Sequence, residues 1–363
     1  MAHKLNRILV EGFKSIKKVD IEIRDLTVLI GPNGAGKSNF IGLFKFLREV
    51  IETRLQVYTG VNGGANKLLH YGSKVSPKMH ISLDFNPNYY EFSLLPTVND
   101  SLLFENEFCY FETSVNNFYR ENINNGGTES ELEAIAKHYN FGTVPKYVLD
   151  VLKNWRLYHF HDTSAEAGVK KIGDSSDMFY LKGDASNLAA FLSYMKTDNE
   201  KHYERIVKTV QLVVPYFKDF VLRPNPFNKT TMMLEWQDKN SEMVFNANDL
   251  SDGSLRFICL ATLLLQPTPP SLILLDEPEL GLHPSAIKLL GSLIRKVSKK
   301  SQIIISTQSV NLVNEFEPQD IVVVENKDGN SKFNRLDHAN LNSWLEKYSI
   351  GELWEQNVLG GKP

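Results

Sequence analysis

The chain has 363 residues, 42% hydrophobic and 23% charged, which suffices for one large domain or two to three smaller ones with a real core. Its 40 basic and 43 acidic side chains give a net charge of −3, which excludes a general attraction to nucleic acid or anionic membrane but not a local basic patch. The two cysteines form no metal-binding cluster or disulfide framework, and the longest apolar runs are too short to span a bilayer. Without a secretory signal at the N-terminus, we expect a cytoplasmic protein with no membrane association.

The first third of the chain predicts short strands around one helix. Apolar residues alternate at Ile8 and Val10, at Ile21 and Ile23, and over 26–30, which is typical of half-buried strands. A helix follows from Lys37, with apolar residues on one face at Phe40, Leu43, Phe44 and Leu47. Antiparallel strands are then predicted over 78–85, 89–95 and 104–113.

The middle third mixes both element types. Thr128 to Glu131 fits a capping box before an apolar helix, and 155–163 predicts a strand. The segment 182–217 predicts mostly helix, capped by Asp184 or Ser186, and a hairpin follows over 230–238 and 243–249.

The final third alternates regularly, as in an α/β core with buried strands. The predicted elements are helix 253–265, strand 271–275, helix 284–298, strand 302–306, helix 309–315 and strand 320–325.

The segment GPNGAGKS, 31–38, satisfies the phosphate-loop pattern G-x-x-x-x-G-K-[ST] between a predicted strand and helix. Its glycines let main-chain N–H groups point at a phosphate, and the helix N-terminus adds a partial positive charge. We expect Lys37 to reach the β and γ phosphates of ATP and Ser38 to bind Mg²⁺. The predicted nucleotide contacts are Gly31, Pro32, Asn33, Gly34, Ala35, Gly36, Lys37, Ser38 and Asn39.

The segment SLILLDEPELGLHP, 271–284, is an apolar strand that ends in two carboxylates. Asp276 is the predicted second ligand of Mg²⁺, and Glu277 is the predicted general base that polarises the attacking water. The alternative is a strand end whose acidic residues simply face solvent. Together with the phosphate loop, the pair favours nucleotide hydrolysis.

The segment LSDGS, 250–254, lies between these motifs and precedes an apolar helix. The order phosphate loop, LSDGS, LILLDEP resembles an ABC-type ATPase head, in which the signature loop faces the γ-phosphate bound by the other subunit. That resemblance implies that Ser251, Gly253 and Ser254 contact the nucleotide of a partner chain. The alternative is a buried helix that Ser251 or Ser254 caps.

The motifs ILVEGFKSIKKVDIEI, DEPELGLHP and QIIISTQS resemble the RecF/OLD/SMC-like branch, and the whole chain is similar to bacterial stand-alone predicted ATPases of the AAA family. The resemblance places Lys14 near the nucleotide and Gln308 where many relatives have a catalytic histidine. Because glutamine cannot carry a proton, we expect slow turnover. Asp252 also departs from the pattern and needs to point away from phosphate or pair with a base such as Arg256.

Several other features stay open. His283 either crosses the dimer or begins a helix, and Gln56 is unconvincing as a Q-loop residue. His159 and His161 share a face of the predicted strand, so a metal site with Asp162 is conceivable, but no third ligand is identifiable. The aromatic residues of 89–111 fit core packing or a stacking surface, and Trp344 to Trp354 fit docking on the head or recruitment of a partner.

We therefore predict an α/β, split ABC-type head with lobe 1–90 plus 246–330, an inserted β-rich and helical lobe 91–245, and a C-terminal docking segment 331–363. The predicted function is Mg²⁺-dependent ATP hydrolysis by a nucleotide-sandwiched homodimer. It acts as a switch or sensor for a separately encoded, nuclease-like effector in DNA maintenance or phage defence. The alternative is an ATP-gated DNA-binding clamp. We expect no coiled-coil arm, and too few residues follow the last core strand for the Toprim nuclease of OLD-type proteins.

Overall fold

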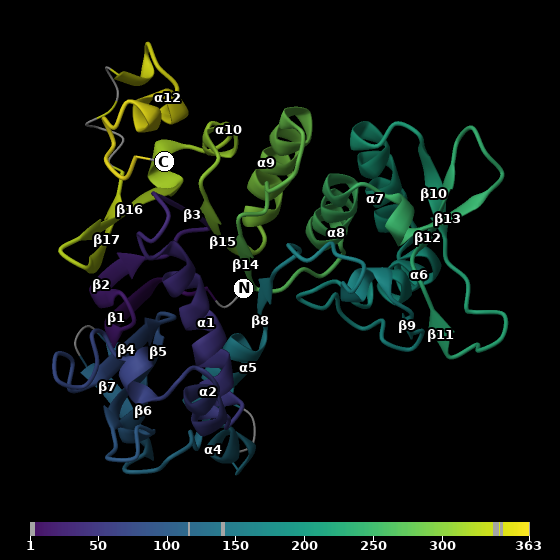
Figure 1. Ribbon diagram of the computed structural model, residues 1–363. Coiled ribbons are helices and arrows are strands. Elements are labelled where there is room, and N and C mark those ends of the chain that lie inside the picture. The colour runs from purple at the N-terminus through teal and green to yellow at the C-terminus, as the bar shows by residue number, and fades with distance from the viewer. Residues whose placement is uncertain (1–3, 115–116, 139–141, 337–340, 342–343, 363) are drawn as a thin grey trace. The chain divides into compact units, whose positions relative to one another are not determined.

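The computed structural model describes residues 4–114, 117–138, 142–336, 341 and 344–362. The chain forms two compact units, unit 1 (Met1–Trp155 with Glu317–Pro363) and unit 2 (Arg156–Phe316), whose elements are labelled in Figure 1. These units have different boundaries from the predicted lobes, because the antiparallel sheet that begins near the N-terminus continues through residue 124.

Unit 1 contains an antiparallel sheet in the order β2-β1-β4-β5-β6-β7. Alternate side chains are buried along its strands, so Tyr90, Phe92 and Phe104 lie in the core while Tyr89 and Tyr110 are half-buried on the other face. Core packing is thus confirmed for three of the aromatic residues. The strands are β1 Arg7–Phe13, β2 Ile16–Glu22, β4 Met79–Asp84, β5 Asn88–Pro96, β6 Leu102–Ser114 and β7 Asn117–Asn124.

Unit 1 also holds the strand that leads into the phosphate loop. β3 (Leu26–Ile30) is buried at all five residues and runs parallel to β16 (Ile321–Lys327), which forms a hairpin with β17 (Asn330–Arg335). α1 (Lys37–Ile51) buries the predicted face with Phe40, Leu43, Phe44 and Leu47. The remaining helices are α2 Leu55–Val61, α3 Ala65–Leu68, α4 Leu132–His138, α5 Val144–Lys153, α12 Ile350–Glu355 and the 3₁₀ helix Pro318–Asp320.

The C-terminal segment packs on unit 1 itself. Leu353 and Trp354 of α12 are fully buried, and the Trp354 indole N–H donates to the carbonyl of Gly361. The Gly361 N–H donates to Glu325 Oε1 of β16 at 3.0 Å. Trp344 is 44% exposed. The last residues therefore dock on β16. Of the two tryptophans that were considered for contact with a partner, Trp344 is the exposed one.

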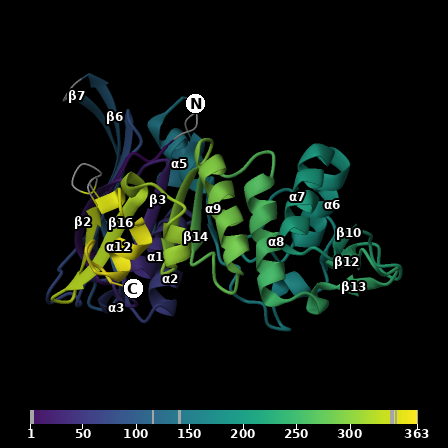
Figure 2. The same cartoon turned by 90° about the horizontal axis from the view of Figure 1, so that it is seen from above.

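Unit 2 is built on two parallel buried strands, β14 (Leu272–Asp276) and β15 (Gln302–Thr307). Figure 2 shows its helices α7 (Glu200–Val213), α8 (Asp252–Leu265) and α9 (Pro284–Ser298) side by side. β8 (Trp155–Tyr158) lies at the boundary of the units. The other elements are α6 Leu188–Asp198, α10 Val310–Val313, β9 Gly173–Asp174, β10 Phe217–Val221, β11 Thr231–Met232, β12 Glu235–Asp238, β13 Val244–Asn246 and the 3₁₀ helices Gly168–Lys170 and Ala247–Asp249.

Three local predictions are wrong, two of them because a neighbouring side chain takes the capping or turn position. α4 begins at Leu132, and the Ser130 hydroxyl rather than Thr128 accepts from its first N–H. α6 begins at Leu188 after Asn187, since Asp184 accepts instead from the N–H of Ser186 in a preceding turn.

The third error is the length of the strand at Trp155, which ends at Tyr158, so His159 and His161 lie beyond it, with their ring centroids 6.1 Å apart. In the described part of the chain, no helix combines the length and apolar composition that a bilayer span needs.

Candidate active site

The phosphate loop connects the end of β3 to α1 in unit 1. The N-cap residue of α1 is Gly36, with φ 114°, and no described side chain caps this helix end. The first turn, Lys37 to Phe40, contains no acidic residue. The N-terminus of α1 therefore presents main-chain N–H groups and a positive dipole end that a bound anion can satisfy.

Lys37 is the buried cation of this loop. Its side chain is folded over the loop, with Nζ donating to the carbonyl of Gly31 at 2.6 Å and to that of Pro32 at 3.1 Å. Ser38 is exposed at the start of the helix. The loop thus brings an ammonium group, a hydroxyl group and a helix N-terminus together, which is the donor set that phosphate oxygens accept from.

A second segment closes on the loop from within unit 1. Ser331 Oγ of β17 lies 2.7 Å from both Ser15 Oγ and the Ala35 carbonyl, and Asn39 Nδ2 donates to Ser15 Oγ at 2.7 Å. A Cβ atom on Gly36 would lie 2.0 Å from Ser331 Oγ, so only glycine fits there. No local motif marks Ser331, so its position beside the phosphate loop could not be predicted from the sequence.

Lys14 precedes Ser15 and has φ 47°. It is half-buried and lines an open pocket of about 810 Å³ together with Asn66, Lys67, Tyr71, Ser73 and Lys74. Burial, and then the neighbouring Lys45, lower the pKa of Lys14 below its ordinary value. Lys14, which is predicted to contact the nucleotide, is therefore next in sequence to Ser15, and the Ser15 hydroxyl is bonded to Ser331 and Asn39 at the phosphate loop.

The acidic strand end lies in unit 2, where β15 and the residue that follows it bind the two carboxylates. Asp276 at the end of β14 accepts a hydrogen bond from the Ser306 hydroxyl, and the Glu277 carboxylate accepts one from Gln308 Nε2. Glu277 has φ 41°, and its N–H donates to the Ser306 carbonyl at 2.8 Å. A left-handed backbone at a glutamate is strained, and such strain is commonest at functional sites.

A further carboxyl group was missed by the sequence analysis. Glu279 is 7% exposed and accepts a hydrogen bond from the Thr307 hydroxyl at Oε1, while its Oε2 finds no hydrogen-bond partner among the described residues. Burial raises its pKa above the ordinary carboxyl value. The pattern D-E-P-E gave no signal, because it does not show which of the three acidic residues turns inward.

The signature loop begins α8 in unit 2 and is capped by its own side chains. Ser251 is the N-cap residue, and its Oγ accepts from Ser254 N at 3.2 Å and lies 2.8 Å from Ser254 Oγ. Asp252 is exposed, and its nearest base is Lys170 at 3.9 Å. Of the two options considered for Asp252, pairing with Arg256 is not the one found, because the Arg256 guanidinium donates to main-chain carbonyls.

Two further candidates have structural roles in this chain. His283 is the N-cap residue of α9 and accepts from Ser285 N at 3.3 Å. Gln56 Nε2 donates to the carbonyls of Leu102 and Thr128 in unit 1.

The metal site that was left open at His159 and His161 finds no support. Within the ranges that the structure describes, no group of three His, Cys, Asp or Glu residues could hold a metal ion. His161 Nε2 instead lies 2.6 Å from the main-chain carbonyl of Asp276.

The fold and these motifs define an α/β ATPase head of the ABC type. The chain belongs to the family described as "AAA domain, putative AbiEii toxin, Type IV TA system", which it matches over residues 26–314. It is accordingly an enzyme of the ATP-binding, ATP-hydrolysing class, and the resemblance to the RecF/OLD/SMC-like branch is confirmed.

Named relatives agree with this family. The chain is 21% identical to the Old nuclease of Escherichia phage P2 over 351 residues, which cover 86% of this chain and 58% of that protein. A shorter match, 31% identical over 75 residues, is to the phosphate import ATP-binding protein PstB 2 of Trichormus variabilis and covers 21% of this chain and 25% of that one. The match thus spans little more than half of the Old nuclease and a quarter of PstB 2.

Solved structures show the same fold. An Smc head bound to the C-winged helix domain of ScpA is similar with a TM-score of 0.60 at 17% identity, covering 93% of this chain and 99% of that one. An Smc head with an extended coiled coil from Pyrococcus furiosus gives a TM-score of 0.54 at 16% identity, covering 94% and 98%.

Proposed function

We propose that the chain binds ATP with Mg²⁺ and hydrolyses it slowly in a homodimer that encloses the nucleotides between its subunits. The observation that carries the proposal is the start of α1, where a helix N-terminus without a side-chain cap, a buried ammonium and a glycine-requiring turn coincide. An entering triphosphate would replace the carbonyls of Gly31 and Pro32 as acceptors for Lys37.

The proposed roles divide the reaction among five residues. Lys37 holds the β and γ phosphates, and Ser38 and Asp276 are the proposed ligands of Mg²⁺, which suit it because a hydroxyl and a carboxylate are hard oxygen donors. Mg²⁺, when bound, neutralises charge on the phosphate oxygens. Glu277 acts as general base on water, and Gln308, which holds the Glu277 carboxylate, orients it. Slow turnover follows because Gln308 cannot accept a proton.

The signature loop is proposed to meet the γ-phosphate of the partner subunit. Ser251, Gly253 and Ser254 stand at the start of α8, whose dipole favours an anion. Support comes from the exposed position of Ser251 and Asp252, and from the interaction between Ser251 and Ser254, which a phosphate oxygen can replace.

The biological role is proposed as a switch or sensor for a separate effector protein of nuclease type in the cytoplasm, in DNA maintenance or phage defence. The nuclease relative of phage P2, of which this chain matches 58%, supports the nuclease part of this proposal. The Smc head that was crystallised with a domain of ScpA supports the idea that a head of this fold holds a partner protein.

The test is the Glu277→Gln variant, which keeps the hydrogen-bonding shape and removes the base. We expect ATP hydrolysis to fall by about 100-fold to 10,000-fold while ATP remains bound. Sedimentation should show a dimer with ATP and a monomer without it. Glu242→Gln, which removes an exposed carboxylate of the same unit, is the control and should behave as wild type. Normal hydrolysis by Glu277→Gln would refute the base assignment.

A DNA-binding clamp is the second candidate, and one observation favours it. Lys14, Lys67 and Lys74 line one pocket, and none of them forms an ion pair with a described residue. Unpaired lysines around one opening can contact a phosphate backbone. A steep salt dependence of duplex affinity that Lys67→Ala and Lys74→Ala reduce would favour the clamp. Lys78→Ala, which removes a lysine paired with Glu105, is the matched control.

A further inference from the structure

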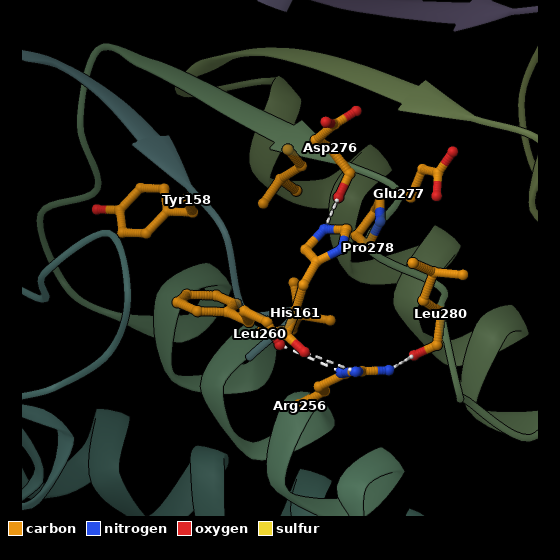
Figure 3. Close-up of a pocket in the computed structure, with 10 residues that line it drawn as sticks. Tyr158, His161, Arg256, Leu260, Asp276, Glu277, Pro278 and Leu280 are labelled. Carbon is orange, nitrogen blue, oxygen red and sulfur yellow. Dashed lines mark hydrogen bonds between the residues drawn. The ribbon is translucent and has the colours of Figure 1, made fainter. Parts of the chain in front are cut away.

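Arg256 joins three segments of unit 2 by its guanidinium group. It lies on α8, two residues after the signature loop, and is half-buried. Nε donates to the Phe160 carbonyl at 3.2 Å, Nη2 to the His161 carbonyl at 2.7 Å and Nη1 to the Leu280 carbonyl at 2.9 Å (Figure 3). Because a guanidinium is planar and rigid, its hydrogen bonds to three main-chain oxygens fix the positions of these segments and do not serve to pair charges.

His161 extends the same linkage to the acidic strand end. Its Nε2 lies 2.6 Å from the main-chain carbonyl of Asp276, and Figure 3 shows the imidazole between that carbonyl and Arg256. Because a carbonyl only accepts, Nε2 carries the proton. The segment 160–161 is therefore bonded to α8 on one side and to the end of β14 on the other.

The main chains of the two loops are also in direct contact. A Cβ atom on Gly253 would lie 2.3 Å from the Gly281 carbonyl oxygen, and one on Gly281, at φ 73°, would lie 2.8 Å from Arg256 Nη1. The cavity that Arg256, His161 and Glu277 line has a volume of about 10 Å³, which leaves space for about one water. A displacement at one loop is therefore passed to the other rather than absorbed by empty space.

We propose that Arg256 and His161 are positioning residues that make the signature loop and the Asp276–Glu277 turn move as one element. This inference rests on the proposed function. In that dimer the signature loop meets the partner's γ-phosphate, whereas Asp276 and Glu277 of the same chain serve its own nucleotide. The linkage therefore connects the two nucleotides of the dimer, and phosphate binding at one site sets the position of the base at the other.

The test is the ATP dependence of hydrolysis. The wild-type dimer should give a Hill coefficient above 1 and at most about 2, the number of sites. In Arg256→Met, which keeps an unbranched apolar stem, we expect the coefficient to fall to about 1 and kcat to fall about 10-fold or more. Binding of a fluorescent ATP analogue should stay within about twofold, since the phosphate loop belongs to unit 1.

Two matched comparisons separate positioning from simple loss of stability. Arg295→Met is the control, because Arg295 also donates from a helix, α9, to a main-chain carbonyl, that of Glu315, and it should retain the wild-type Hill coefficient. His161→Gln can still donate to the Asp276 carbonyl and should keep the cooperativity that His161→Ala loses. This pair also decides the question if Arg256→Met does not fold.

Failure of the proposed linkage and failure of the proposed function give different results. A wild-type Hill coefficient of 1, or cooperativity that survives in both Arg256→Met and His161→Ala, overturns the linkage while leaving the ATPase intact. Absence of ATP hydrolysis by the wild-type protein, or no dimer in Glu277→Gln, overturns the proposed function instead.

Discussion

Two helix N-termini in this chain are proposed to meet phosphate, and they differ in how their N–H groups are satisfied. α1 in unit 1 follows its N-cap residue Gly36 without a described side-chain cap or an acidic first turn, and its first residue is Lys37. α8 in unit 2 follows its N-cap residue Ser251, whose hydroxyl caps the helix, and its first residue is the acidic Asp252.

The difference indicates that the N-terminus of α1 binds phosphate tightly (the tight site), whereas the N-terminus of α8 binds it only under an added condition (the conditional site). An anion at α1 gains donors that no side chain occupies and a buried cation, whereas an anion at α8 must replace the Ser251–Ser254 interaction and approach a carboxylate. A single subunit should therefore hold ATP through α1. Contact with α8 should need the added binding energy of dimer formation. The following changes break or sharpen this contrast.

Lys37→Ala should have the largest effect, because it removes the cation of the tight site. We expect the affinity for a fluorescent ATP analogue to fall at least about 100-fold, since charge-assisted bonds to phosphate are among the strongest in proteins. Lys45→Ala, on an exposed part of the same helix, is the control and should bind as wild type. Retained affinity in Lys37→Ala would refute the assignment of the tight site.

Ser251→Arg should separate the two helix ends. The bulky side chain occupies the conditional site, so hydrolysis should fall at least about 100-fold, while the monomer should bind ATP within about twofold of wild type. Steady-state hydrolysis and equilibrium titration measure the two quantities. A parallel loss of ATP affinity would mean that the signature loop touches the nucleotide of its own chain.

Asp252→Asn should shift the balance toward dimerisation. Removing a largely exposed carboxylate near the partner's phosphate should tighten the ATP-dependent dimer of the Glu277→Gln background about threefold. The loss of a favourable first-turn acid should lower stability by about 0.5 kcal/mol. Sedimentation at several concentrations gives the dimer constant, and an unchanged constant would argue against phosphate at α8.

Glu279→Gln should have the smallest effect, on stability at the acidic strand end. Because burial raises the pKa of Glu279, the folded state holds its proton more tightly than the unfolded chain does. The free energy of unfolding should therefore fall as pH rises from the ordinary carboxyl pKa through the raised value. The glutamine variant should lose less over that window, as urea unfolding at a series of pH values would measure. Parallel profiles for wild type and variant would contradict the burial argument.

Sequence patterns anticipated elements whose signals are local. The phosphate-loop glycines and Lys37 follow a buried strand and open a helix, as predicted, and Ser251 precedes the helix that it caps. The strand end at Tyr158 was missed because the His159 N–H donates to the carbonyl of Gly183 in a distant segment. The start of α6 at Leu188 was missed because Asn187 Oδ1 accepts from the N–H of Lys182 in the turn that precedes the helix.

Alone, the amino-acid sequence determined which chemical groups this protein carries and on what kind of element, since a phosphate loop or an acidic strand end is a contiguous pattern of a few residues. Only the tertiary structure decided how those groups are held. Ser331 meets Ser15 across 316 positions of chain, and Arg256 meets Phe160 across 96. It also decided that Glu279 turns inward. Such contacts depend on which distant segments pack together, and local periodicity carries no information about that packing.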